Sequence, residues 1–134
     1  MANSTCANSI CLGVIVGNRD FFPDVLITEA RKDLTKLFSE LQIEPIWLSP
    51  EESKLGAVET WADAQKCGEL LRKNRARIEG ILVCLPNFGD EKGVADSIRL
   101  GETHVPVLVQ ACPDDLDQFG LDRRRDALLC RSAW

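Results

Sequence analysis

Histidine is nearly absent from this chain: His104 is the only one among 134 residues. The cysteines form no C-x-x-C pair, so one histidine leaves no zinc-finger spacing. His104 has no serine or cysteine partner at a motif spacing, so a nucleophilic triad is not supported. No carboxylate–histidine cluster completes a metal site. We therefore predict no catalytic residue, no metal ligands and no cofactor in this chain, and we expect His104 to be a surface or interface residue.

Long apolar runs are also absent. No stretch approaches the ~20 residues that a membrane-spanning helix needs, and no positive charge precedes the first apolar segment, as a secretory signal would require. We therefore expect a cytoplasmic protein without a membrane partner. In that compartment thiols stay reduced, and isolated cysteines behave as small buried hydrophobes. We predict reduced thiols at all six positions: Cys6, Cys11, Cys67, Cys84, Cys112 and Cys130.

An excess of positive charge is missing as well. The net charge is −5 and the pI is about 4.9, which disfavours nucleic-acid binding. The one basic run, residues 123–125, lies between Asp122 and Asp126. A solvated face explains this run best, and a phosphate or subunit contact is the alternative.

The nucleotide-binding fingerprints are absent too. Gly13 and Gly17 do not form G-x-G-x-x-G, and the Gly-Lys-Ser/Thr ending of a P-loop is missing. The loop after Gly17 is not rich in serine or threonine, so it does not resemble a flavodoxin-type phosphate loop. A small flavodoxin-like enzyme acting on a phosphorylated ligand is therefore disfavoured.

Short β-like runs alternate with helical periodicity along the chain, which favours parallel βαβ units. We predict strands at 10–16, 44–48, 81–85 and 105–109, and helices at 24–42, from Thr60 onwards and around 94–98. Pro45 indicates an edge or first position in the second strand. The predicted fold is a three-layer α/β/α, flavodoxin-like (Rossmann-like) domain with a four-stranded parallel sheet in the order 2-1-3-4. The fourth strand would be an uncovered apolar edge, so the domain is expected to have a neighbour, either more of its own chain or another subunit.

Two helix boundaries carry specific signals. Thr60 and Asp63 fit a capping box at the start of the second helix, and Gly101 fits a C-cap of the third. Apolar spacing predicts that the buried face of the second helix comprises Ala64, Cys67, Leu71 and Ile78.

Polar and aromatic loops follow the first and third strands, at 17–23 and 85–93. Ligands of open α/β sheets bind outside the carboxyl ends of the strands, so these loops predict a binding site. Arg19 offers a forked guanidinium for hydroxyls, carboxylate or phosphate; an ion pair with Asp20, Asp24 or Asp90 is the alternative. Candidate substrate-binding residues are Arg19, Asn18, Asn87, Phe88 and Gln110.

The other candidate residues at these loops have structural explanations as well. An amide beside an aromatic ring, as at Asn87 and Phe88, is a common sugar-binding combination; a turn residue with an aromatic lid on the core explains it equally well. Gln110 either reaches the crevice or satisfies backbone groups. Glu59 is best explained by helix capping, and residues 90–92 by favourable charge at a helix start.

Four segments together resemble the N-terminal domain of the L-fucose/L-arabinose isomerase family, above all its fucose isomerase-like members. They are residues 13–23 (GVIVGNRDFFP), 56–60 (GAVET), 85–93 (LPNFGDEKG) and 105–110 (VPVLVQ). The resemblance runs from about residue 10 to residue 126.

The resemblance implies an enzyme of three α/β domains that interconverts aldoses and ketoses through an enediol. A divalent metal, usually manganese, would be held by acidic and histidine ligands of the later domains. Family enzymes are trimers or hexamers, and their N-terminal domain contacts the sugar in a neighbouring subunit. The matching positions here are Arg19 and, in the third loop, Asn87 and Phe88.

The chain departs from the family at its end. It stops at Trp134, and residues 126–134 (DALLCRSAW) do not resemble the family's continuation. We therefore expect a flavodoxin-like domain at 1–126 and an atypical tail at 127–134, left by truncation or a frame change. Such a fragment lacks the metal-binding domains and would be inactive alone. A stand-alone small-molecule binding or subunit-interaction module without catalysis is the alternative, and the sequence does not identify the sugar.

Overall fold

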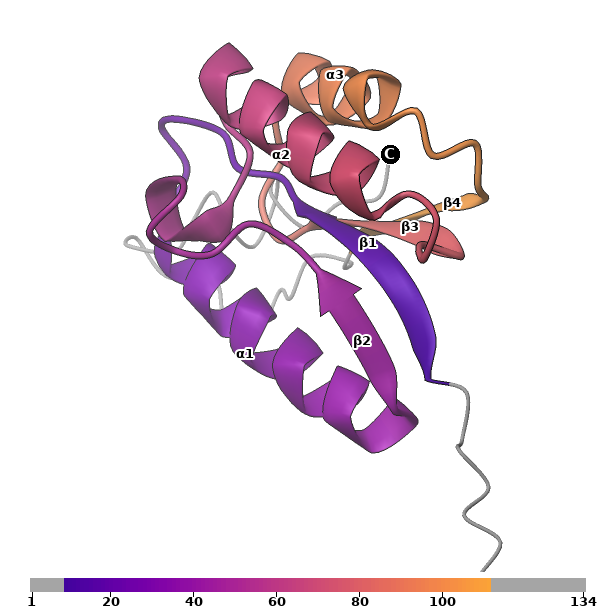
Figure 1. The fold of residues 1–134 in the computed structure, drawn as a ribbon. Helices are drawn as coiled ribbons and strands as arrows, with labels where there is room; N and C mark the ends of the chain where they lie inside the picture. The colour runs from indigo at the N-terminus through magenta and orange to yellow at the C-terminus, as the bar shows by residue number, and fades with distance from the viewer. Residues whose placement is uncertain (1–8, 112–134) are drawn as a thin grey trace, which may run out of the picture.

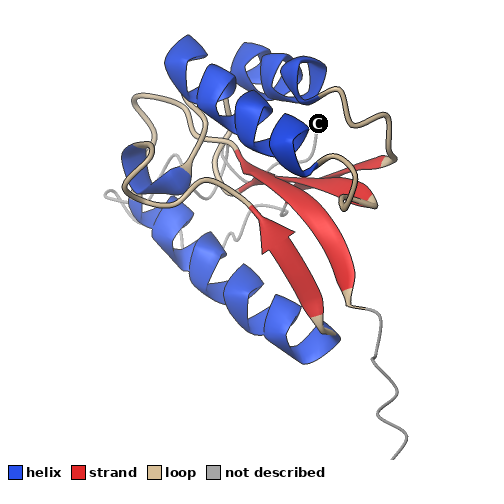
Figure 2. Ribbon diagram, in the orientation of Figure 1, coloured by secondary structure: helices blue, strands red, loops and turns tan. Residues whose placement is uncertain are grey.

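A computed structural model of the chain describes residues 9–111. Four parallel strands, β1 (Ile10–Val16), β2 (Ile43–Ile46), β3 (Gly80–Leu85) and β4 (Val107–Ala111), form one sheet in the order β2-β1-β3-β4. Helix α1 (Val25–Leu41) covers one face, and helices α2 (Trp61–Asn74) and α3 (Glu91–Gly101) cover the other (Figures 1 and 2). The predicted three-layer α/β/α fold and strand order are confirmed.

Side-chain alternation along the central strands builds one core on each face of the sheet. Ile15 and Val83 face α2 and α3, where they join the cluster that includes Leu71. Val14 faces α1, where it joins the cluster that includes Phe38. Because both faces are buried, β1 and β3 are nearly continuous apolar runs, as parallel strands usually are.

Glycine lets α2 and α3 approach closely. A Cβ atom at Gly68 would lie 2.4 Å from the Cβ of Leu100, and one at Gly101 would lie 3.0 Å from the Cβ of Leu71. The two helices therefore share a tight interface near the C-terminal end of α3.

The capping box at the start of α2 is confirmed. The Asp63 N–H donates to Thr60 Oγ1 at 3.2 Å, and the Thr60 N–H donates to Asp63 Oδ2 at 2.9 Å. Asp90 caps α3 with a single hydrogen bond, because its Oδ2 accepts from the Gly93 N–H at 2.6 Å. The helix-start role expected for Asp90 is therefore confirmed.

Two details of the helix predictions are wrong. Ile78 does not belong to α2, which ends at Asn74; it reaches the core from the loop that follows. Gly101 is the last residue of α3, and the left-handed residue that ends the helix is Glu102, with φ of 47°. A glycine is needed at 101 for the contact with Leu71 rather than for a turn.

Two strands are displaced from their predicted bounds. β4 begins at Val107 rather than at residue 105, because the ladder starts where Val107 pairs with Ile81. Before it, the Pro106 carbonyl accepts from the Ile81 N–H at 2.9 Å. β2 ends at Ile46 rather than at residue 48, since Trp47 turns away to pack on α1. Its position at the sheet edge, predicted from proline, is confirmed.

Cys11, Cys67 and Cys84 are buried thiols and not disulfide halves. Burial raises the pKa of Cys67 to about 11. Cys6, Cys112 and Cys130, the basic run at 123–125 and the expected boundary at 126 lie outside the described residues. Within 9–111, none of the helices has the length and apolar character needed to cross a bilayer.

Candidate functional site

The two loops predicted to form a site lie side by side, because they follow β1 and β3, which are neighbours in the sheet. The helices that follow these two strands, α1 and α3, pack on opposite faces (Figure 1). In open α/β sheets, the carboxyl ends of two such strands are where the ligand-binding crevice lies. A third loop joins them, because Gly17 bridges Val58 and the Asn18 N–H donates to the Val58 carbonyl at 3.0 Å.

Asn18 and Asn87 fill the base of this crevice, and neither has any solvent exposure. Asn87 Nδ2 donates to Asn18 Oδ1. Asn87 Oδ1 accepts from the Arg19 N–H at 3.2 Å and from the Gly89 N–H at 3.4 Å. Both were predicted to bind substrate, and the structure shows them joining the loops beneath the surface.

Asn18 also ties the crevice to a charged cluster. Its Nδ2 donates to Glu59 Oε2 at 2.9 Å and to Asp24 Oδ1 at 3.1 Å. Lys54 Nζ lies 3.1 Å from Asp24 Oδ2 and 3.7 Å from Glu59 Oε2. Burial raises the pKa of Glu59, and the hydrogen bond to Asp24 raises the pKa of Lys54. The loop after β2, which carries Lys54 and Glu59, is therefore held to the loop after β1 by two carboxylates, one ammonium and one amide.

Two members of this cluster depart from the sequence analysis. Glu59 does not cap α2, because Thr60 and Asp63 do so and Glu59 instead accepts from Asn18. Lys54 was not predicted at all. It lies in a short 3₁₀ turn (Lys54–Gly56), thirty residues from Asp24, and no local spacing connects the two.

Arg19 and Phe88 form the rim above the buried amides. Arg19 Cζ lies 6.0 Å from the centroid of the Phe88 ring. The partner of Arg19 is Glu91, at 3.5 Å between Nη1 and Oε1, rather than one of the three aspartates considered from the sequence. The two side chains are 36% and 51% exposed, so this ion pair stands in solvent and is weak.

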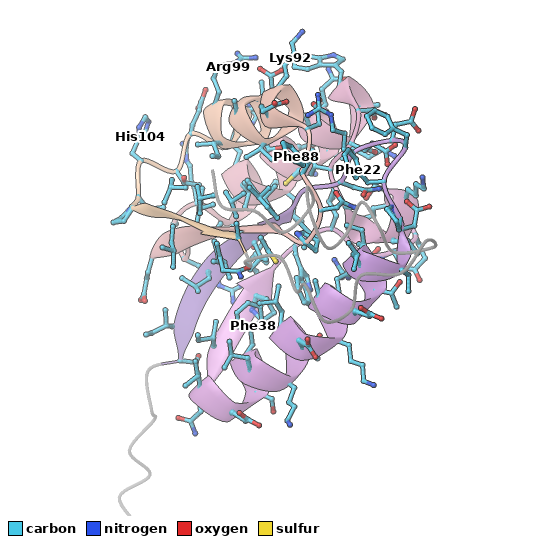
Figure 3. The ribbon with its side chains drawn as sticks, turned by 180° about the vertical axis from the view of Figure 1, so that it is seen from behind. Phe22, Phe38, Phe88, Lys92, Arg99 and His104 are labelled. Atoms are coloured by element: carbon cyan, nitrogen blue, oxygen red, sulfur yellow. The ribbon has the colours of Figure 1, made fainter. Side chains whose placement is uncertain are left out.

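Further aromatic rings extend the rim. Phe22 stacks on Phe88 with ring centroids 5.7 Å apart (Figure 3). Phe21, with 65% of its surface exposed, lies 4.7 Å from Phe22. The rim thus offers an apolar surface beside a guanidinium and a carboxylate, which suits a ligand with both C–H faces and hydroxyls.

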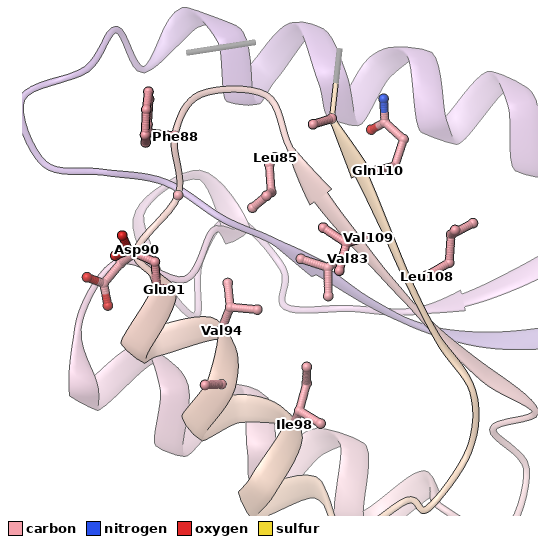
Figure 4. Close-up of a pocket in the computed structure, with 13 residues that line it drawn as sticks. Val83, Leu85, Phe88, Asp90, Glu91, Val94, Ile98, Leu108, Val109 and Gln110 are labelled. Carbon is pink, nitrogen blue, oxygen red and sulfur yellow. The ribbon is translucent and has the colours of Figure 1, made fainter. Parts of the chain in front are cut away.

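Gln110 does not join this rim. Its Oε1 accepts from Cys84 Sγ at 3.3 Å, and its side chain points away from α3 (Figure 4). His104 is exposed and precedes β4, at the opposite end of that strand from the crevice. Of the five candidate residues, the structure brings together Asn18, Arg19, Asn87 and Phe88.

Among residues 9–111, no three histidine, cysteine, aspartate or glutamate side chains are grouped as ligands. The manganese that the resemblance implies for full-length family members stays a prediction.

The chain was compared with known proteins. The model of one family, described as the N-terminal domain of fucose/sulfoquinovose isomerase, matches residues 13–130. No curated protein and no solved structure matched. The matched residues include the loops that carry Arg19 and Phe88.

Proposed function

Because this chain belongs to the fucose/sulfoquinovose isomerase family through its N-terminal domain, we propose that it is the substrate-contacting and oligomerisation domain of an aldose–ketose isomerase. Its part in the reaction is to bind and orient the sugar. Metal binding and proton transfer belong, in this proposal, to later domains of the enzyme, as the family resemblance implies.

The rim formed by Arg19 and Phe88 carries this proposal. A guanidinium donates several hydrogen bonds in a fixed fork and matches neighbouring oxygens of a sugar. An aromatic face packs against the C–H groups of the ring. Both residues follow a buried asparagine, so the loops that carry them have a fixed base.

Without a ligand, the Arg19 guanidinium at the rim is paired with Glu91. Its carboxylate pairs with Arg19 in solvent, where an ion pair contributes about 0–1 kcal/mol. A sugar with vicinal hydroxyls displaces this contact at little cost. The freed carboxylate then accepts hydrogen bonds from the same ligand.

The test is a titration of the full chain with L-fucose and with sulfoquinovose. Binding is measured by calorimetry or by NMR shifts of the 85–93 loop. Arg19→Ala should weaken binding about tenfold or more, since hydrogen bonds to a charged group contribute about 1.5–3 kcal/mol. The matched control is Arg99→Ala, because Arg99 is an exposed arginine on α3 that pairs only locally with Asp96. Equal affinity in both variants would contradict the proposal.

The oligomerisation part of the proposal needs its own measurement. The exposed apolar residues of β4, which include Leu108 at 66% exposure, are the observation that favours a subunit contact. Light scattering of the full chain should give a defined trimer or hexamer. A clean monomer that still binds sugar would favour the alternative, a stand-alone binding module without catalysis.

A further inference from the structure

The three described helices begin at the edge of the sheet that carries the Arg19 rim. Each helix follows a strand, so the N-termini of α1, α2 and α3 lie beside the loops after β1, β2 and β3 (Figure 1). A helix N-terminus carries partial positive charge and unpaired N–H groups, and phosphate and sulfate groups bind there readily. An anionic ligand at this edge would therefore use one of these helix ends.

Carboxylates of the chain itself already occupy all three helix ends. Asp24 is the residue before α1, and Asp63 lies in the first turn of α2, where it is part of the capping box. Asp90 precedes α3, and its Oδ2 accepts from the Gly93 N–H at 2.6 Å. A ligand anion at any of these ends would lie beside a carboxylate, and like charges so close together repel each other.

Cations are scarce in the loops between these strands and helices. The three loops together carry six carboxylates and two cations, Arg19 and Lys54. Both cations are paired: Arg19 Nη1 lies 3.5 Å from Glu91 Oε1, and Lys54 Nζ lies 3.1 Å from Asp24 Oδ2. A sulfonate on a sugar would have to displace a carboxylate of the protein from one of these two cations.

The groove beside the rim is acidic at one end and apolar elsewhere. It lies between α3 and β4, has a volume of about 640 Å³, and is lined at one end by Phe88, Asp90 and Glu91 (Figure 4). These two acids are the charged residues among its described lining, and apolar side chains such as Val94 and Ile98 line the rest. A methyl group of a sugar fits such walls, whereas a sulfonate would lose its water there and gain no cation.

Hydroxyl groups suit the rim because each can both donate and accept a hydrogen bond. A sugar hydroxyl accepts from the Arg19 guanidinium and donates to the Glu91 carboxylate, so both charged groups keep a partner. A sulfonate only accepts hydrogen bonds, so it would satisfy Arg19 and leave Glu91 facing a second anion. The mixed charge of the rim therefore favours an uncharged ligand.

We propose that this site selects an uncharged sugar over one that carries a sulfonate, carboxylate or phosphate, and that Glu91 sets this selection. The family's description names fucose, which is uncharged, and sulfoquinovose, which carries a sulfonate. The inference rests on the proposed function, because it concerns the sugar bound at the Arg19 rim. Glu91 is thus a specificity-determining residue that acts through its charge.

Calorimetric titration of the full chain with two matched pairs of sugars tests this. L-Fucose is compared with L-galacturonate, and D-quinovose with sulfoquinovose; within each pair the sugars differ only at C6, where the second one carries the anion. We expect the uncharged member of a pair that binds to bind at least tenfold more tightly. Added salt should strengthen binding of the anionic member alone, because salt screens the repulsion.

Glu91→Gln removes the charge and keeps the size of the side chain. The preference for the uncharged member should fall about fivefold, as expected when one unit charge about 4 Å from the ligand anion is removed in water. Glu102→Gln is the matched control. Glu102 lies at the other end of α3, is 56% exposed against 51% for Glu91, and pairs with Arg75 at 3.4 Å. Its loss should leave the preference unchanged.

The outcomes separate this inference from the proposed function. Anionic sugars that bind as tightly as their uncharged partners would overturn the inference and leave the proposed function standing. An equal preference in Glu91→Gln and Glu102→Gln would contradict the role of Glu91. No binding of any of the four sugars would contradict the proposed function, and this inference with it.

Discussion

The side-chain amide of Asn87 donates a hydrogen bond to that of Asn18, 69 residues earlier in the chain, and both side chains are fully buried. Asn18 lies two residues after the end of β1, and Asn87 lies two residues after the end of β3. Their contact fixes the distance between the loops that present Arg19 and Phe88. If these loops bind the sugar as proposed, a change at either buried amide alters both stability and binding.

Loss of the Asn87 side chain should destabilise the domain more than loss of an ordinary helix asparagine. Asn87→Ala leaves the Arg19 and Gly89 N–H groups and Asn18 Oδ1 without a partner, at about 1–3 kcal/mol for each buried group left unsatisfied. We expect a total loss of about 3 kcal/mol or more in urea unfolding. Asn74→Ala, which removes one contact to the Leu70 carbonyl, is the control and should lose less than half as much. Similar losses of stability in both variants would contradict the conclusion that Asn87 holds the two loops together.

The Glu59 carboxyl should make stability depend on pH. Burial raises its pKa in the folded protein above the ordinary value of 4.5, so the folded state binds the proton more tightly than the unfolded chain. This contribution to the free energy of unfolding is complete below about pH 4.5 and is lost as pH rises through the folded pKa. Relative to Glu59→Gln, the native protein should therefore gain stability from pH 7 to pH 4.5.

The control for that pH series has the opposite sign. Hydrogen bonding to Lys73 lowers the pKa of the exposed Glu69, so Glu69→Gln should reveal a contribution that is lost on acidification. Urea unfolding of the native protein and both variants at five pH values gives the comparison. Parallel curves for the native protein and Glu59→Gln would show that Glu59 does not titrate differently on folding.

Adding a single methyl group between α2 and α3 should destabilise the domain. In Gly68→Ala the new Cβ would lie 2.4 Å from the Cβ of Leu100, which is too close to the helix backbone to move aside. We expect a net loss of about 1–3 kcal/mol, although alanine is the better helix former. Gly80→Ala is the control, because its Cβ would lie 3.3 Å from the tip of the flexible Leu12 side chain and at an ordinary contact distance of 3.6 Å from the Pro106 carbonyl oxygen. Thermal unfolding that ranks the two variants in the reverse order would count against this packing.

The buried thiols should react only when the domain opens. Burial holds the pKa of Cys67 at about 11, so the reactive thiolate is scarce at pH 8 and the sulfur is also shielded. Iodoacetamide followed by mass spectrometry should show Cys67 unmodified in buffer and modified in urea. Rapid labelling of Cys67 in buffer would mean that the contact between α2 and the sheet opens readily.

Local signals in the sequence predicted most of the fold. The apolar runs gave β1 and β3, helical spacing gave α1, and Thr60 with Asp63 located the start of α2 within one residue. The errors arise where tertiary contacts decide. β4 starts where Ile81 offers a partner, and Ile78 reaches the core although it lies outside the helix.

The site was predicted less completely, for the same reason. The composition of the loops and the rule for parallel sheets located Arg19 and Phe88 at one edge. The hydrogen bond between Asn18 and Asn87 depends on the register of β1 and β3, and no local sequence pattern predicts that register. Lys54 enters through a 3₁₀ turn whose geometry includes Leu55 at φ of 55°, an unusual value for a leucine.

The two edges of the sheet differ in a way that limits how it can grow. β2 carries Pro45, which has no N–H to donate, and Glu44, which pairs with Arg77. β4 (Val107–Ala111) has neither proline nor charge. Edge proline and charge discourage pairing with another strand. Among residues 9–111, β4 is therefore the edge of the sheet at which a further strand can pair, whereas β2 disfavours such pairing.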